Sequence, residues 1–203
     1  MPNVTSNQPS RTDALCALAG AVVAGDPRAI EAFVKAAGPP VLGVARKILG
    51  KCHPDVEDVV QEALFAALDA LPRFRRECSV LHFVCRVAVL TSMNARRRLR
   101  VHELITSDSA DVDQRPADEP TPMGHALSAR RREAFRRLLD ELPPEQAEVL
   151  ALHCVLGYTV AETALSTGAP ANTVRGRLIT AKNVLRQRMA ADPQLCELMR
   201  GAS

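Results

Sequence analysis

Apolar residues recur every three or four positions along most of the chain, which is the spacing of amphipathic α-helices. The pattern predicts eight helices in two blocks of four. The expected helices span residues 13–24, 27–50, 54–71 and 78–100 in the first block and 126–141, 144–156, 159–167 and 171–190 in the second. The expected fold is therefore all-α, with two small helical domains, 13–100 and 126–191.

Proline and glycine residues mark the expected breaks between these helices. Gly25–Pro27 separates the first helix from the second, and the sequence AGPP at Ala37–Pro40 is expected to interrupt the second helix. Pro54 suits the first turn of the third helix, where its missing N–H is not needed. Pro72 ends that helix, because a residue that precedes proline disfavours the helical conformation.

A stretch without helical periodicity, residues 101–125, lies between the two blocks. It contains three prolines, and its charged residues are Glu103, Asp108, Asp111, Asp113, Arg115, Asp118 and Glu119. This acidic composition is typical of a flexible linker. About 25 residues can extend to roughly 85 Å, which would allow two domains to bind at separate places. Residues 1–12 and 192–203 are expected to be tails.

The last two expected helices have the pattern of a DNA-binding helix-turn-helix, with a glycine stop at Gly168 between them. One side of the longer helix is apolar. The other side carries cations and hydrogen-bonding groups, and the residues that we expect to contact DNA are Asn172, Thr173, Arg175, Arg177, Lys182 and Arg186. Arginine near the start of such a helix can pair with guanine, and later cations suit phosphates. An ordinary amphipathic hairpin with a solvated basic face is the alternative.

Two more residues on the outer side of this helix favour DNA binding. Gly176 lies inside the helix, where glycine costs about 1 kcal/mol relative to alanine. Close approach of a DNA backbone would be a reason to keep this position free of a side chain. Ile179 also points outward and could touch a thymine methyl group.

The third expected helix has an unusual outer face. Asp58, Gln61, Glu62 and Phe65 share one side at about 100° per residue, and Val56, Val60, Ala63 and Ala67 share the opposite side. Two acids, an amide and a phenyl ring are therefore expected to face away from the core. A solvated acidic face is the usual explanation of such a cluster, but it would not explain the phenylalanine.

Composition then limits the class of protein. The 203 residues have a net charge of only +3 and 3% aromatic residues, so the placement of charge is more informative than its sum. The six cysteines form no CxxC pair, which suits a reducing compartment, and we expect the protein to be cytoplasmic. The sequence shows no signal peptide and no apolar run that could enter a membrane.

No catalytic pattern is evident in the sequence. It has no phosphate-binding G-x-x-x-x-G-K-[ST] motif, no HExxH motif and no site-like arrangement of acids with a histidine. We therefore expect neither enzymatic activity nor a cofactor. Cys78, His82 and Cys85 would share one face of a helix and could in principle bind zinc, but core packing is the expected role of such cysteines.

The arginines of the sequence NARRRLR, at the end of the first block, exceed what a helix C-terminus needs. They are Arg96, Arg97, Arg98 and Arg100. A solvated helix end is the simpler explanation of such a cluster. Because four cations gather within one and a half turns, contact with nucleic acid is the preferred interpretation.

Together these parts resemble the extracytoplasmic-function (ECF) sigma factors, a compact two-domain group of bacterial RNA polymerase specificity subunits. The segment AFVKAAGPPVLGVARKILGKCHPDVEDVVQEALFAALDALPRF is similar to the first conserved region of that family, including its acidic D-x-x-Q-E signature at Asp58, Gln61 and Glu62. The segments LPPEQAEVL and NTVRGRLITAK are similar to the start and the reading helix of its C-terminal region. The order and spacing of these motifs make the combination specific.

The resemblance implies a role for each block. The face with Asp58, Gln61, Glu62 and Phe65 would dock on the clamp helices of the largest subunit of core RNA polymerase. The helix-turn-helix would read the −35 duplex of promoter DNA, and the acidic linker would thread polymerase channels that nucleic acid normally fills. An anti-sigma factor is the expected regulatory partner.

For the melted −10 strand, the resemblance places Phe83 where the family usually has tryptophan, and Val89–Leu90 where it has an Arg–Asn pair. Single-strand capture uses aromatic stacking and cations. We therefore assign it to the loop Arg73–Ser79 and the arginine cluster. The candidate residues are Arg73, Phe74, Arg96, Arg97, Arg98 and Arg100. With few rings available, a weak promoter melter that depends on a near-consensus promoter is expected.

Two other functions are compatible with parts of the sequence. A helix-turn-helix regulator that binds DNA without recruiting polymerase would not need the face between Asp58 and Phe65. A degenerate sigma-like protein-interaction module would not need Arg175 and Arg177. Binding to core polymerase and to specific duplex DNA therefore separates the three functions.

Overall fold

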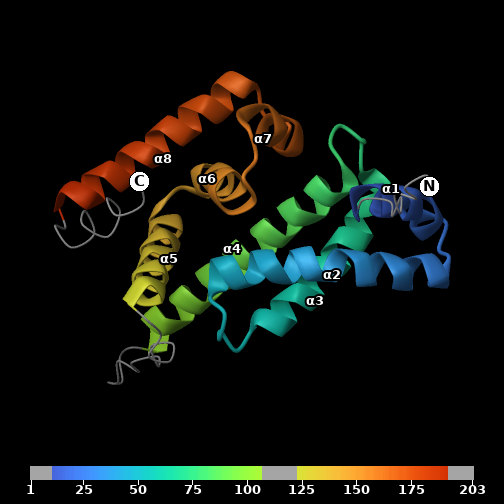
Figure 1. Ribbon diagram of the computed structural model, residues 1–203, viewed down its shortest axis with the longest axis horizontal. Helices are drawn as coiled ribbons and strands as arrows, with labels where there is room; N and C mark the ends of the chain where they lie inside the picture. Colours follow the sequence, from blue (N-terminus) through green and yellow to red (C-terminus); the bar gives the residue numbers. More distant parts are fainter. Residues whose placement is uncertain (1–10, 107–122, 192–203) are drawn as a thin grey trace, which may run out of the picture.

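The computed structural model of the chain describes residues 11–106 and 123–191, which form α-helices and one short 3-10 turn, without β-strands in these ranges (Figure 1). The first block contains α1 (Arg11–Val23), α2 (Pro27–Leu49), α3 (Val56–Ala70), the 3-10 turn (Leu71–Arg73) and α4 (Val80–Thr106). The second block contains α5 (Met123–Glu141), α6 (Pro144–Leu156), α7 (Val160–Thr167) and α8 (Ala171–Ala191). The expectation of an all-α protein is confirmed.

The observed helices start within three residues of the expected positions, but α4 ends later than expected. It continues to Thr106 because the sequence VHELIT after Arg100 contains neither glycine nor proline. The first residues of the expected linker therefore belong to α4 and its last residues to α5. The remainder, 107–122, lies outside the described residues. The expected tails 1–12 and 192–203 also fall largely outside them.

The expected interruption of the second helix is wrong, because α2 runs without a break through Pro39 and Pro40. Proline inside a helix costs about 3 kcal/mol, so other contacts must compensate. Ala37 and Val41 flank the prolines and are fully buried, and Phe33 one turn earlier is also fully buried. Tertiary packing of this apolar side keeps the helix continuous.

The larger of the two clusters of buried apolar side chains contains residues of both blocks, and the smaller one lies within the first block. In the first block, α2 packs against α1, α3 and α4. In the second block, α6 lies between the first block and α8, so that α8 forms the outer edge of the molecule (Figure 1). None of the helices in the described ranges is both long enough and apolar enough to cross a membrane.

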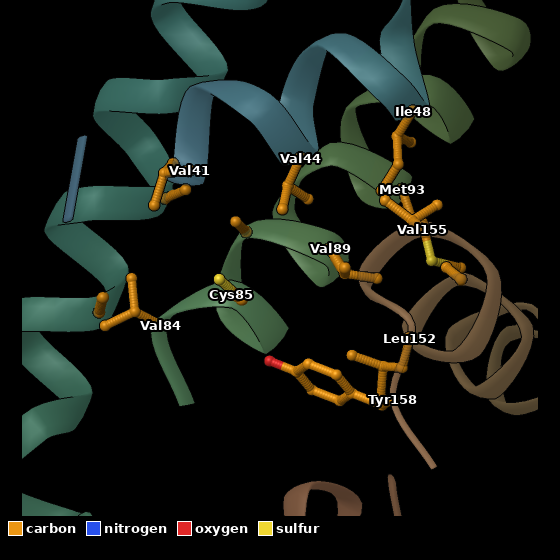
Figure 2. Packing of buried hydrophobic residues seen from close by; sticks show 14 of the residues in the cluster. Val41, Val44, Ile48, Val84, Cys85, Val89, Met93, Leu152, Val155 and Tyr158 are labelled. Carbon is orange, nitrogen blue, oxygen red and sulfur yellow. The ribbon is translucent and has the colours of Figure 1, made fainter. Parts of the chain in front are cut away.

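Figure 2 shows where the two blocks meet in this core. Side chains of α2 and α4, including Val44, Ile48 and Val89, face Leu152 and Val155 of α6. Tyr158 follows α6 and is only 7% exposed. Its ring lies beside Leu152, and its hydroxyl is directed toward α4 (Figure 2). Apolar side chains of the first block therefore help to bury the apolar side chains of the C-terminal block.

Local capping fixes the short helix α7 of the helix-turn-helix. The Thr159 hydroxyl accepts a hydrogen bond from the Glu162 N–H at 3.2 Å, and the Glu162 carboxylate accepts one from the Thr159 N–H at 2.8 Å. This is a capping box, which satisfies two otherwise unpaired N–H groups. At the other end Gly168 adopts a left-handed conformation with φ of 68°, as its predicted role as a helix stop requires.

The hydrogen bonds of the capping box also lower the pKa of the Glu162 carboxyl from its ordinary value of 4.5, mainly through the Thr159 backbone N–H. A carboxyl with a lowered pKa in the folded state stabilises the fold above its unfolded pKa. Its contribution is lost as the pH falls through the folded pKa. We therefore expect this cap to weaken only in acid.

Replacing Thr159 with alanine should lower the free energy of unfolding by about 1 kcal/mol, because the side-chain acceptor of the cap is lost. Urea denaturation followed by circular dichroism measures this difference. Thr180→Ala is the matched control, since the Thr180 hydroxyl donates to the Gly176 carbonyl inside α8 and caps no helix end. Equal destabilisation by the two substitutions would contradict the capping role of Thr159.

Candidate polymerase and nucleic-acid interfaces

The outer face of α3 has the composition that the sequence predicts. Asp58, Gln61, Glu62 and Phe65 are all exposed, and Phe65 is 70% exposed. The opposite side is buried through Val56, Val59, Ala63 and Ala67, with Val59 taking the place expected for the half-buried Val60. A phenyl ring in water next to three polar side chains has no role in folding. This acidic-aromatic face is therefore available to a partner.

A shallow pocket borders this face between α3 and α4. It is lined by Asp55, Asp58, Val59, Glu62, Ala95, Arg98 and Leu99. Arg98 Nη2 donates to Glu62 Oε2 at 2.8 Å across the pocket, and the two side chains are 61% and 48% exposed. Exposed ion pairs contribute little to stability, so a cation of a partner could replace Arg98 at low cost.

The four arginines at residues 96–100 do not form one basic surface. Successive residues of a helix point about 100° apart, and the side chains diverge accordingly. Arg96 pairs with Asp140 of α5 and is 16% exposed, and Arg98 pairs with Glu62. Arg97 is half-buried and Arg100 is exposed. In this conformation only Arg98 and Arg100 of the four are well exposed.

In the loop before α4, the predicted Arg73 is joined by two more cations, Arg75 and Arg76. Arg73, Arg75 and Arg76 are all exposed, and Arg76 adopts a left-handed backbone with φ of 59°. This conformation is uncommon for a residue other than glycine and is frequent at functional loops. Arg75 and Arg76 both lie in the run RFRRE, within the loop Arg73–Ser79 that the sequence predicts for strand capture, although only Arg73 and Phe74 are named there as candidates.

The two candidate stacking rings of this region lie against each other. The ring centroids of Phe74 and Phe83 are 4.9 Å apart with an angle of 37° between the ring planes, and both residues are half-buried. Both rings also pack against the core. Each ring therefore offers only part of its surface to an unpaired base.

The helix α8 divides into an apolar and a polar side, as its sequence predicts. Val174, Leu178 and Ala181 are buried against α6 and α7. Five of the six candidate DNA-binding residues are exposed, namely Asn172, Thr173, Arg175, Lys182 and Arg186. Arg175 Nη1 donates to Asn172 Oδ1 at 3.0 Å, which holds the guanidinium beside the start of the helix.

The sixth candidate, Arg177, is placed differently. Its Nη2 donates to Glu145 Oε2 of α6 at 2.6 Å, and its side chain is 26% exposed. Glu145 lies 32 positions earlier in the chain, so no local pattern could have revealed the pair. Arg177 thus contributes to the contact between α8 and α6 in this structure.

The space around Gly176 and Ile179 completes the outer face of α8. A Cβ atom at Gly176 would meet no described protein atom within 4 Å, so packing inside the protein does not explain the glycine. Ile179 is 57% exposed on the same helix. The outer face therefore combines cations, a glycine without a side chain and one exposed apolar side chain. This combination suits contact with a DNA groove.

Cys78, His82 and Cys85 do not gather into a metal site. The described ranges contain no group of three or more histidine, cysteine or acidic residues with suitable geometry. The His82 ring instead lies against Tyr158, with ring centroids 4.1 Å apart. Burial raises the pKa of the Cys85 thiol to about 11, although a hydrogen bond with Tyr158 opposes this shift. Cys85 is therefore a protonated thiol in the core.

Comparison with known proteins identifies both blocks. Residues 33–101 match the family model described as Sigma-70 region 2, and residues 126–182 match the one described as Sigma-70, region 4. The first match contains the acidic-aromatic face of α3, and the second contains α6, α7 and most of α8.

Relatives align over most of the chain. The ECF RNA polymerase sigma factor SigD of Mycobacterium tuberculosis (strain ATCC 25618 / H37Rv) is 30% identical over 178 residues, which cover 86% of this chain and 81% of SigD. The ECF RNA polymerase sigma factor SigC of Mycobacterium tuberculosis (strain CDC 1551 / Oshkosh) is 27% identical over 176 residues, which cover 87% of this chain and 91% of SigC.

A solved structure has a similar fold. CnrH, in complex with the cytosolic domain of CnrY, aligns with a TM-score of 0.57 and 24% sequence identity, covering 89% of this chain and 99% of CnrH. The likeness concerns the order and packing of the helices.

Proposed function

The chain belongs to the extracytoplasmic-function sigma factors of the sigma-70 family, and from this membership we propose how its two helical blocks divide the work of transcription initiation. As an alternative sigma factor it binds core RNA polymerase and directs initiation at its promoters. The first block docks on polymerase and holds the melted −10 strand. The second block reads the −35 duplex through α8.

The observation that carries the polymerase assignment is the acidic-aromatic face of α3. Its carboxylates at Asp58 and Glu62 would meet cations on the clamp helices of the largest polymerase subunit. Phe65, 70% exposed in the free protein, would become buried at the centre of the contact. Buried aromatic anchors surrounded by polar contacts supply much of the binding energy of many interfaces.

The DNA assignments use the outer face of α8, the cations of the loop before α4 and two exposed arginines in the later turns of α4. Asn172, Thr173 and Arg175 lie in the first two turns of α8, near the helix start where a recognition helix contacts base edges. Lys182 and Arg186 lie further along and suit phosphates, which fix the register of the helix. For the single strand we propose the exposed arginines of the loop 73–79 together with Arg98 and Arg100.

The remaining features of this function follow from the family. We propose that the protein acts in the cytoplasm, where polymerase and promoter DNA are found, and that an anti-sigma factor controls it. Its work is binding rather than catalysis. No cofactor is required for any step proposed here.

The test of the proposed function combines capture and transcription. The full chain, immobilised through a tag, should retain bacterial core RNA polymerase, and the resulting holoenzyme should give new start sites in run-off transcription from a promoter library. Specific duplex binding without polymerase capture would instead identify a helix-turn-helix regulator. Polymerase capture without new start sites would identify a sigma-like interaction module.

Promoter melting should be the weak step of this sigma factor. Phe74 and Phe83 pack on each other, and stacking of a base on an aromatic ring is worth about 1–3 kcal/mol. We expect a mismatched −10 element to reduce open-complex formation roughly tenfold per lost stacking contact. Permanganate reactivity of unpaired thymines on promoter DNA measures this loss.

A template with a pre-melted −10 bubble is the control for that measurement, because it removes the cost of strand separation. Transcription from the mismatched promoter should recover on the bubble template. Efficient opening of badly mismatched duplex promoters would contradict the weak-melter prediction.

A further inference from the structure

The arginines of α8 fall into two groups according to their partners. Arg177 Nη2 donates to Glu145 Oε2 of α6 at 2.6 Å. Arg188 Nε donates to Glu141 Oε2 of α5 at 2.8 Å. Both guanidiniums are thereby paired with a carboxylate of a helix that precedes the helix-turn-helix, and these pairs fasten α8 to the rest of its block. The other two arginines of α8 donate to neutral side-chain amides instead.

Each of these two arginines follows an asparagine by one helical turn. Arg175 Nη1 donates to Asn172 Oδ1 at 3.0 Å. Arg186 Nη1 donates to Asn183 Oδ1, also at 3.0 Å. Helical side chains lean toward the helix N-terminus, so a long side chain can reach the residue one turn earlier. The second pair follows the first by about three turns, or roughly 16 Å along the axis. Both pairs therefore lie on the same side of α8, where all of their residues are exposed.

An amide partner orients a guanidinium without neutralising it. The asparagine oxygen occupies one of the N–H donors of arginine, and the others remain for two parallel hydrogen bonds to a guanine edge or a phosphate. The positive charge also remains in full, because the amide is neutral. A flexible arginine loses side-chain freedom when it binds, and a side chain that is already held loses less. Amide-held arginines are therefore better prepared to bind DNA than arginines without a holder.

We propose that Asn172 and Asn183 are positioning residues of the DNA-binding surface, which hold neighbouring arginines in a binding conformation and make no base contact of their own. Asn172 acts on base reading through Arg175, near the start of α8. Asn183 acts on phosphate binding through Arg186, further along the helix. The proposal rests on the proposed DNA-binding function of α8, and it replaces the direct DNA contact that the sequence predicts for Asn172. The holding of Arg175 can be measured without DNA.

The first test uses the free protein. Nitrogen NMR relaxation measures the order parameter of the Arg175 Nε–H bond, which reports how strongly the side chain is held. Asn172→Ala should lower this order parameter, because the guanidinium loses its acceptor. The same substitution at Asn94, an exposed asparagine of α4, is the matched control and should leave it unchanged. Circular dichroism checks that each variant is folded. An unchanged order parameter in folded Asn172→Ala would overturn the proposal.

The second test measures affinity for duplex DNA by anisotropy, at one fixed salt concentration. The probe is a fluorescein-labelled duplex that the full chain enriches from a randomised pool, and a scrambled duplex of the same composition is compared with it. Asn172→Ala should weaken binding to the enriched duplex roughly three- to tenfold and binding to the scrambled duplex less. Asn183→Ala should weaken binding to both duplexes by the same factor, because phosphate contacts carry no sequence information. Asn94→Ala should bind like the unmodified chain.

A double-mutant cycle separates positioning from direct contact. If Asn172 acts through Arg175, Asn172→Ala should cost no further affinity in a chain that already carries Arg175→Ala. An equal loss with and without Arg175 would show that Asn172 touches DNA itself, which would overturn the proposal. If the pool yields no enriched duplex, the DNA-binding role of α8 fails and the proposal fails with it. An enriched duplex without capture of core polymerase would instead refute only the polymerase part of the proposed function.

Discussion

Replacing both Asp58 and Glu62 with lysine should abolish capture of core RNA polymerase, with a loss of affinity of roughly a hundredfold or more. The substitutions put like charges where we propose that carboxylates meet polymerase cations, and like-charge contacts cost several kcal/mol at an interface. Both residues are exposed, so the fold should persist. Retention of polymerase on the immobilised variant measures the effect.

Two controls make this result specific. The variant with Glu31→Lys and Glu141→Lys changes the net charge equally at exposed positions outside the acidic-aromatic face, and it should retain polymerase. Binding of the Asp58→Lys, Glu62→Lys variant to duplex promoter DNA should also persist, because α8 is untouched. Normal polymerase capture by that variant would remove the basis of the proposed docking surface.

Phe65 tests the apolar part of the same surface. Because its ring is 70% exposed, Phe65→Ala should leave the free energy of unfolding almost unchanged. If the ring is a buried anchor in the complex, the substitution should still weaken polymerase binding by about 2 kcal/mol or more. An effect on binding without an effect on stability is characteristic of an interface residue.

The sequence was sufficient to predict which sides of α3 and α8 face the core. In α3 and α8 the apolar residues repeat at helical spacing, and burial of one side exposes the other. The acidic-aromatic face and the basic outer face of α8 therefore follow from local pattern. Gly168 was equally predictable, because the left-handed conformation at a helix end favours glycine.

Effects that depend on distant residues were not predictable. Local rules place a break at Pro39 and Pro40, but the buried side chains on either side keep α2 continuous. Arg96 and Asp140 are 44 positions apart, and either would be an ordinary surface residue in an isolated helix. The four arginines at residues 96–100 are neighbours in the sequence but have different surroundings in the structure.

An ion pair inside the second block changes how the candidate DNA-binding residues should be ranked. Arg175 is exposed near the start of α8, whereas Arg177 pairs with Glu145. An arginine that must first leave a carboxylate gains less from a new partner than one that is hydrogen-bonded to a neutral amide, as Arg175 is to Asn172. The sequence predicts the same DNA-binding role for Arg175 and Arg177. In the structure, only Arg175 has a guanidinium that is exposed and not paired with a carboxylate.

Arg175→Ala should therefore weaken binding to the −35 duplex by about 1–3 kcal/mol, the usual value of a specific arginine contact to a base. Arg177→Ala should cost less, because part of the lost interaction is with Glu145 rather than with DNA. Anisotropy titrations with the isolated duplex, at one fixed salt concentration, measure both changes. The fixed salt matters because phosphate contacts make all such affinities depend on ionic strength.

Arg188→Ala supplies the control, since Arg188 lies in the last turns of α8 and pairs with Glu141. It should reduce affinity only slightly and equally for the −35 duplex and a scrambled duplex. Arg175→Ala should instead reduce the ratio between the two duplexes, because a base contact carries sequence information and a phosphate contact does not. If Arg175→Ala lowers both affinities by the same factor, Arg175 binds the backbone, and base reading must lie elsewhere on the outer face of α8.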